Sequence, residues 1–242
     1  MQASETAIDL AKREGRNNVR FFTPELHEQM QATLAIERDL QHAVARGQLV
    51  LHYQPQVDTQ GQLVGVEALL RWHHPVRGLV YPGEFIAIAE ENGLIVPIGR
   101  WVLQTACRQL ASWASSPASR RLPVAVNVSA RQFMEDDFVA VVQSALRETG
   151  ADPRLLELEV TESMMVDVDR AIPKMQELRA IGLTFSVDDF STGYSSLAHL
   201  TRLPIAKLKI DQSFVRNMDV QPADRIIVQA IIGLAHSLGL SV

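Results

Sequence analysis

Short apolar runs alternate with amphipathic segments from about residue 48 to the end of the chain. The runs are rich in Val, Leu and Ile and have the length of buried strands, whereas the segments between them repeat apolar residues at helical spacing. Strands are predicted at 49–56, 63–72, 122–129, 155–163, 183–190 and 205–211, with another beginning at 241–242. Helices are predicted at 83–91, 97–114, 131–148, 168–180 and 222–238.

This repeated strand-then-helix order predicts an α/β fold with parallel strands and right-handed crossovers. A TIM-like (β/α) barrel explains the order best, and a doubly wound open sheet is the alternative. Neither a G-x-G-x-x-G nor a G-x-x-x-x-G-K-[ST] loop follows the early strands. Their absence disfavours the open nucleotide-binding sheet.

The region before the first strand has a different pattern. Residues 1–23 are polar and basic, and residues 24–47 repeat apolar positions at near-helical spacing. Pro24 suits the first position of a helix and Gly47 suits its end. We therefore predict a linker helix over 24–47, which leads into a domain over 48–242.

Composition narrows the functional classes. The chain has 242 residues, 47% of them hydrophobic, so one large domain with a sizeable core is expected, and this length is within the range of a single α/β barrel. The 23 basic and 28 acidic side chains give a net charge of -5, which disfavours a sequence-independent grip on duplex nucleic acid and leaves a specific anionic small molecule open. The single cysteine excludes an internal disulfide and a cysteine-based zinc site and fits a reducing cytoplasm. No apolar run has the length of a membrane span, and an anchor outside this sequence is left open.

Polar and mostly acidic residues recur at the carboxyl ends of the predicted strands. Alternation along a strand puts Glu67 on the same face as Arg71. In a barrel, the carboxyl ends of several strands converge on one mouth. We therefore expect five side chains to meet there: Glu67, Asn127, Glu159, Asp188 and Asp189.

Carboxylates that converge in this way repel one another, and burying them without a counter-charge either protonates them or costs several kcal/mol. A bound cation would neutralise this repulsion. Because only oxygen ligands stand at these strand ends, Mg²⁺ or Mn²⁺ is favoured over zinc. The adjacent Asp188 and Asp189 allow one carboxylate to bridge two ions while the other serves the second, which is the layout of a two-metal site for attack on a phosphodiester. Arg71 and Lys209 add positive charge suited to phosphate oxygens.

Each candidate also has a simpler structural explanation. Glu67 and Arg71 could form an ion pair, and Lys209 could be solvated. The Asp188-Asp189 pair, followed by Phe-Ser-Thr-Gly, could form a turn. The recurrence of these residue types at several strand ends is what favours a shared site.

Two other features are assigned structural roles. His73 and His74 stand side by side before Pro75 and point in different directions, which favours a surface turn over a metal pair. Cys107 recurs with Leu103 at helical spacing, which indicates a buried helix face. Neither feature adds to the candidate site.

A family resemblance is carried by six segments: YQPQVD, VEALLRWHHPVRGLVYPGEFIAIAEENGLI, VAVNVSARQF, LELEVTES, VDDFSTGYSSLAHLTRLP and AKLKIDQSFV. Together they resemble the EAL domain, the cyclic-di-GMP-specific phosphodiesterase of bacterial second-messenger signalling. The resemblance runs from about Leu49 to the last residue, and the length and order of the motifs argue against chance. It implies a TIM-like barrel with an antiparallel first strand, and a two-metal hydrolysis of cyclic di-GMP to linear pGpG.

The resemblance also implies roles for the matching residues. The metal ligands would be Glu67, Asn127, Glu159, Asp188 and, for the second metal, Asp189. The catalytic group would be Glu67, Glu162, Asp189 and Lys209. In that group Lys209 would hold or orient the attacking water, and Glu162 would steady the loop after Asp188. The substrate would be contacted by Gln54, Leu69, Leu70, Arg71, Asn127 and Asp188.

Further expectations concern the two ends and one loop. AKREGRNNVRFF resembles the closing segment of a GGDEF diguanylate cyclase domain, so residues 1–23 would be the tail of such a neighbour in a tandem GGDEF-EAL protein. The loop after Asp188 is expected to order around metal and a homodimer partner, with Ser191 in place of the commoner glycine. Beyond Val242 the family continues along its seventh strand to another metal-binding glutamate, so the C-terminal barrel units are expected to be missing from this sequence.

The leading hypothesis is a cytoplasmic, Mg²⁺- or Mn²⁺-dependent cyclic-di-GMP phosphodiesterase domain. The alternative is a catalytically inactive EAL domain that binds cyclic di-GMP as a receptor. Every metal-site and lysine position that this sequence covers matches the active pattern, which favours the enzyme. A barrel lyase of the enolase kind also uses strand-end carboxylates and Mg²⁺, but the motif match disfavours it.

Overall fold

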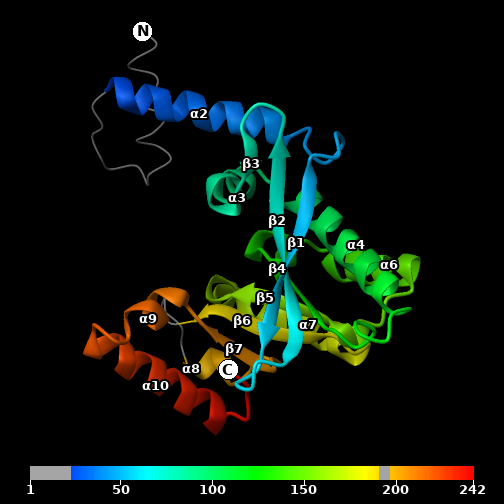
Figure 1. The fold of residues 1–242 in the computed structure, drawn as a ribbon, viewed down its shortest axis with the longest axis vertical. Coiled ribbons are helices and arrows are strands. Elements are labelled where there is room, and N and C mark those ends of the chain that lie inside the picture. The colour runs from blue at the N-terminus through cyan, green and yellow to red at the C-terminus, as the bar shows by residue number, and fades with distance from the viewer. Residues whose placement is uncertain (1–22, 191–196) are drawn as a thin grey trace.

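The computed structural model describes residues 23–190 and 197–242. The GGDEF-like segment within residues 1–22 lies outside the described residues, as does the stretch 191–196 with Ser191. Strands and helices alternate along the chain around one sheet (Figure 1). The predicted α/β architecture is therefore confirmed.

The sheet contains the predicted strands and one short additional strand. Its members are β1 (Leu49–Val57), β2 (Leu63–His74), β3 (Gly78–Val80), β4 (Val124–Val128), β5 (Leu156–Thr161), β6 (Thr184–Phe190) and β7 (Lys207–Ile210). They lie in the order β1-β2-β4-β5-β6-β7, with β3 beside β2. β1 is antiparallel to β2, as the resemblance implied, whereas β2, β4, β5, β6 and β7 pair in parallel. Ser241 bridges to Lys207 in parallel, so a further strand position begins beside β7, and the described sheet is open between Ser241 and β1.

Helices connect these strands. They are α2 (Pro24–Leu40), α3 (Pro82–Glu91), α4 (Ile95–Trp113), α5 (Ala130–Met134), α6 (Phe138–Thr149), α7 (Val168–Ala180), α8 (Leu197–Leu200), α9 (Gln212–Asn217) and α10 (Pro222–Ser237). Two short 3₁₀ helices are η1 (Pro153–Leu155) and η2 (Glu162–Asp167). None of the helices in the described part of the chain is both long enough and apolar enough to span a membrane.

Two predicted boundaries are wrong for local reasons. The single helix predicted over 131–148 is divided into α5 and α6, because Glu135 takes an extended ψ of 137° that ends α5. Ser129 fixes the start of α5, since its side chain accepts a hydrogen bond from Gln132 N at 3.1 Å. The strand predicted over 155–163 ends at Thr161, where η2 begins.

The start of α2 follows from its sequence. Pro24 occupies the first helical turn, and the side chain of Thr23 accepts a hydrogen bond from Leu26 N at 3.3 Å. The regular helix ends at Leu40, seven residues short of the predicted end at 47, and hydrogen-bonded turns continue to Gly47, which has a φ of 64°. α2 lies across one end of the β1–β2 ribbon and packs against α3 (Figure 1).

His74 joins α2 to β2. The prediction of a surface turn holds for residues 75–77 but is wrong for His74, which is only 6% exposed. Its Nδ1 accepts hydrogen bonds from Val76 N and Arg77 N at 3.1 Å, and its Nε2 lies 3.1 Å from Asp39 Oδ2. Because Nδ1 accepts from the backbone, Nε2 is the ring nitrogen that donates to Asp39.

The core lies between the sheet and its helices. Among its largest buried side chains are Trp72 on β2, Phe85 on α3, Phe133 on α5 and Phe185 on β6. Trp72 donates from Nε1 to Gln48 at 3.1 Å and meets Phe85 edge-on, with ring centroids 5.7 Å apart. This packing fixes α3 against the strand that carries Glu67. The burial predicted for Cys107 is confirmed.

Candidate active site at the strand ends

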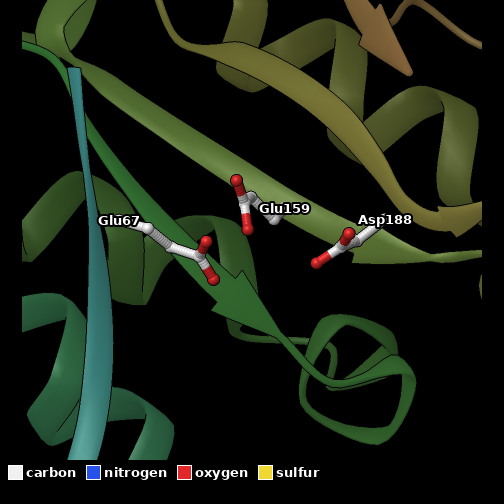
Figure 2. Close-up of side chains that lie close together, drawn as sticks. All are labelled: Glu67, Glu159 and Asp188. Atoms are coloured by element: carbon white, nitrogen blue, oxygen red, sulfur yellow. The ribbon is translucent and has the colours of Figure 1, made fainter. Parts of the chain in front are cut away.

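Three carboxylates from three parallel strands converge. Glu67 on β2, Glu159 on β5 and Asp188 on β6 each present an oxygen, and these oxygens lie within 4.8 Å of one another. Figure 2 shows the three side chains pointing into one shared space. The parallel register causes this, because Asn127 of β4 pairs with Glu159 and Thr161 of β5 pairs with Asp188.

Lys209 of β7 lies among these acids. Its Nζ is 2.5 Å from Glu159 Oε2, 2.8 Å from Asp188 Oδ2 and 3.4 Å from Glu67 Oε2. Burial lowers the pKa of Lys209, but the Glu159 charge and hydrogen bonds to Asp188 and Glu159 outweigh it, so the pKa lies above its ordinary value. Lys209 is therefore a fixed ammonium donor and not the solvated side chain of the simpler explanation.

Asn127 completes the contacts of Glu67. The Asn127 side-chain amide donates to Glu67 Oε1 at 2.7 Å, while Lys209 approaches Glu67 Oε2. Within the described residues, Glu67 and Arg71 form no ion pair. The Arg71 guanidinium instead donates to Leu70 O at 2.8 Å and lies over the Tyr81 ring, 5.1 Å from its centroid. The Glu67–Arg71 ion pair of the simpler explanation is therefore excluded, and the ion-pair partner of Glu67 is Lys209.

The charge balance fits a cation at this position. Three carboxylates face one lysine, and Glu159 is only 1% exposed. Burial raises the pKa of Glu159. Within the described part of the chain, the buried Glu159 Oε1 makes no hydrogen bond. A set of oxygen donors with surplus negative charge and an unsatisfied buried oxygen suits a hard divalent ion.

Asp189 lies apart from the three converging carboxylates. Its φ of 51° is in the left-handed region that Asp tolerates better than most residues, and its N–H donates to Asp188 Oδ1 at 2.9 Å. Its side chain lines a neighbouring cavity. Burial, followed by the charge of Asp188, raises the pKa of Asp189 to about 6. Asp188 and Asp189 both lie within β6, and the register between β6 and β7 shifts between Val187 and Phe190. The turn explanation is therefore wrong for the two aspartates, and Asp189 marks an irregular point of the strand.

A cavity of about 760 Å³ adjoins the carboxylates, within the range of small-molecule sites. Its polar side includes Asn127, Thr161, Asp189 and Gln212. Leu69 and Leu70 line it from β2. The remaining wall comes largely from α3 and α4, through Pro82, Gly83, Ile86, Ala87, Glu90, Ile95, Ile98, Gly99 and Val102. Sequence reasoning missed this wall, because its residues follow the ordinary apolar periodicity of core helices.

Two other candidates lie near the site. Gln54 on β1 pairs with Glu67 across the antiparallel ribbon and is exposed. Glu162 is the first residue of η2, directly after β5, and is 8% exposed. Its predicted contact with the loop after Asp188 involves residues 191–196, which are outside the described residues. The roles of both residues remain predictions.

Fold and site together define an α/β domain whose largely parallel sheet, open within the described residues, carries an acidic, cation-ready site at the carboxyl ends of its strands. The sequence model of the EAL domain matches residues 37–242. The chain belongs to the EAL domain family. The match begins within α2, upstream of the first strand.

Relatives and solved structures agree with this membership. The chain is 44% identical over 241 residues to the bifunctional diguanylate cyclase/cyclic di-GMP phosphodiesterase MucR of Pseudomonas aeruginosa, covering 99% of this chain and 35% of the relative. It is 40% identical over 240 residues to the cyclic di-GMP phosphodiesterase PdeR of Escherichia coli, covering 99% and 36%. The chain thus spans about a third of the length of these relatives. The structure of a PaMucR phosphodiesterase in complex with c-di-GMP matches with 46% identity and a TM-score of 0.81, covering 85% of this chain and 84% of the other.

Proposed function

We propose that this chain hydrolyses cyclic di-GMP to linear pGpG as a divalent-metal-dependent phosphodiesterase domain. The observation that carries the proposal is the group of Glu67, Glu159 and Asp188 around Lys209, next to a cavity of about 760 Å³. The names of MucR and PdeR, and the c-di-GMP complex of a structure 46% identical to this chain, support the substrate.

Mg²⁺ or Mn²⁺ would be held by Glu67, Glu159 and Asp188 together with the amide oxygen of Asn127, and Asp189 would serve a second ion. These oxygen donors match the preference of both ions. A bound divalent cation supplies an acidified water and stabilises negative charge that develops on a phosphate. The unsatisfied Glu159 Oε1 and the excess of carboxylates over lysine support this assignment.

The chain's own groups supply positioning and charge. Lys209 donates hydrogen bonds from a fixed position among the acids, which suits it to hold the attacking water. Arg71 lies on the same face of β2 as Glu67, four residues further toward the carboxyl end, and suits a phosphate oxygen. Leu69 and Leu70 offer apolar surface from the cavity wall. Gln54, opposite Glu67, is assigned to the substrate as well.

The proposal extends to the surroundings of the domain. We assign residues 1–23 to the tail of a GGDEF-like neighbour, 24–47 to a linker and 48–242 to the EAL domain, working in the cytoplasm as a homodimer. The large share of MucR and PdeR that lies outside the match supports a multidomain setting. A monomer mass that does not change with concentration would contradict the homodimer.

The direct test is conversion of cyclic di-GMP to pGpG by the full-length protein with Mg²⁺ or Mn²⁺, followed by chromatography of the nucleotides. Glu67→Ala should abolish turnover, because it removes one metal ligand and the acceptor for Asn127 and Lys209. Glu177→Gln is the matched control, since Glu177 contacts Gln143 on the outer helices. Binding of cyclic di-GMP without turnover under either metal would favour the receptor alternative, and wild-type rates in Glu67→Ala would refute the ligand role of Glu67.

A further inference from the structure

An exposed aromatic side chain, Tyr81, lies beside the cavity and has no role in the site described so far. Tyr81 is 54% exposed, and it directly precedes Pro82 and Gly83, which line the cavity at the start of α3. A large ring that stays in water at the entrance to α3 contributes little to the core. Exposure of a single ring is ordinary by itself, so the relevant observation is which side chain Tyr81 contacts beside the cavity.

The partner of Tyr81 is the proposed phosphate-binding arginine. The guanidinium carbon of Arg71 lies 5.1 Å from the Tyr81 ring centroid, within the range of a cation–π contact. Leu69 and Leu70, which precede Arg71 on β2, line the same cavity. Cavity-lining residues thus flank the pair in both chain segments: 69–70 directly precede Arg71, and 82–83 directly follow Tyr81.

The contacts of Arg71 leave most of its donors for a ligand. A guanidinium has five N–H donors, and within the described residues the hydrogen bond to Leu70 O uses one of them. That hydrogen bond restrains the group at one nitrogen, and the Tyr81 ring restrains its plane. Without the ring, the long side chain would regain rotamer freedom that substrate binding would have to remove again.

We infer that Tyr81 is a positioning residue for substrate binding, which acts by holding the Arg71 guanidinium ready for a phosphate of the cyclic dinucleotide. This inference rests on the proposed function and adds a residue that sets substrate affinity. Tyr81 contacts Arg71 and not the reacting atoms, so its loss should weaken substrate binding and leave the chemical step intact.

The test compares Tyr81→Ala with Tyr81→Phe in the full-length protein. Tyr81→Ala should raise KM for cyclic di-GMP about two- to fivefold, the strength of an exposed cation–π contact, with kcat unchanged within about twofold. Tyr81→Phe keeps the ring and should restore KM. Val76→Ala is the matched control, because Val76 is 87% exposed in the turn between β2 and β3, on the same hairpin. An unchanged KM in Tyr81→Ala, or a fall in kcat alone, would overturn the inference.

A double substitution tests whether Tyr81 acts through Arg71. Arg71→Ala should raise KM more than Tyr81→Ala does, and the Arg71→Ala/Tyr81→Ala double variant should match Arg71→Ala. Additive effects would show that Tyr81 does not act through Arg71 and would overturn the inference. If the wild-type protein binds cyclic di-GMP but does not hydrolyse it, the proposed function fails. The same comparisons of Kd, measured by calorimetry, then decide the role of Tyr81.

Discussion

Two lysines on β7 face acids of β5 in two successive layers of the barrel interior, and the layers differ in charge balance. In the lower layer Lys207 Nζ lies 2.9 Å from both carboxylate oxygens of Glu157, one cation against one anion. In the upper layer Lys209 contacts Glu159, Asp188 and Glu67, one cation against three anions. The same residue types at the same spacing thus form a closed structural pair in one layer and an unbalanced site in the next.

The difference shows how to recognise a site among buried ion pairs. A balanced and hydrogen-bonded pair satisfies its own charges, and its removal is felt in stability. An unbalanced group remains electrostatically unfavourable until another charge joins it, which is the condition for binding a cation. Substitutions in the two layers should therefore have different effects: mainly on stability in the lower layer, and on catalysis and metal binding in the upper layer.

The largest expected effect is on catalysis. Lys209→Met should lower kcat at least about a hundredfold, because it removes the donor that would hold the attacking water. Lys207→Met should keep kcat within about tenfold and instead lower stability by about 1–3 kcal/mol, since Glu157 loses its partner in a partly exposed pair. Turnover assays and thermal unfolding of both variants measure the two effects. Equal losses of kcat in Lys209→Met and Lys207→Met would contradict the proposed difference between the two layers.

The second-largest expected effect is the stabilisation of the protein by a bound metal ion, which should depend on the upper layer and not on the lower one. At about 100 times its Kd, Mg²⁺ or Mn²⁺ should stabilise the wild-type protein by about 2.7 kcal/mol, equivalent to roughly 5–10 °C in Tm. Glu159→Gln should remove most of this shift, because Glu159 carries the unsatisfied oxygen of the upper layer. Glu157→Gln should retain it. Calorimetry with and without EDTA measures the shifts, and a metal response that depends on Glu157 would contradict the assignment.

A smaller effect, on the pH dependence of stability, is expected at the contact between Asp39 of α2 and His74 of β2. The hydrogen bond from His74, with a further contribution from Arg38, holds the pKa of Asp39 below its ordinary value. A lowered carboxyl pKa stabilises the folded state above the unfolded pKa, and this contribution is lost as pH falls through the folded value. Asp39→Asn should therefore be less stable than wild type at pH 7, and the gap should close below about pH 4. Urea unfolding across this pH range is the measurement, and a gap that widens on acidification would refute the sign.

The smallest effect belongs to a balanced pair on the surface. Arg154 makes two hydrogen bonds to Asp152, one to each carboxylate oxygen, and its side chain is 78% exposed. Exposed pairs of this kind contribute little, because water and salt screen them. Arg154→Ala should leave Tm and turnover at wild-type values. A change as large as that of Lys207→Met would mean that burial is not what separates these pairs.

The sequence predicted the elements and the convergence of the acids because both follow from local periodicity. Alternation along the strands placed Glu67, Glu159 and Asp188 at one mouth, and the structure brings them together. Lys209 was ambiguous, because an ion pair with acids on three other strands is a long-range contact that spacing along β7 does not determine.

Other features depended on contacts that no local pattern contains. His74 was assigned to the surface, but Asp39, 35 positions earlier, buries it through α2. The cavity wall of α3 and α4 was missed because its residues have the same apolar spacing as core residues. The break between α5 and α6 comes from the extended backbone of Glu135, which the acidic run after α5 did not signal.

Labelling of Cys107, the single cysteine of the sequence, can report how often the fold opens locally. Cys107 lies on α4 with no exposed surface, and burial raises the pKa of its thiol to about 12. A thiol reagent can therefore react only during moments when α4 separates from the sheet. α4 also supplies part of the cavity wall. The rate of Cys107 labelling therefore measures how often that wall opens. A ligand that binds in the cavity and holds α4 in place should lower this labelling rate in proportion to the occupancy of the cavity.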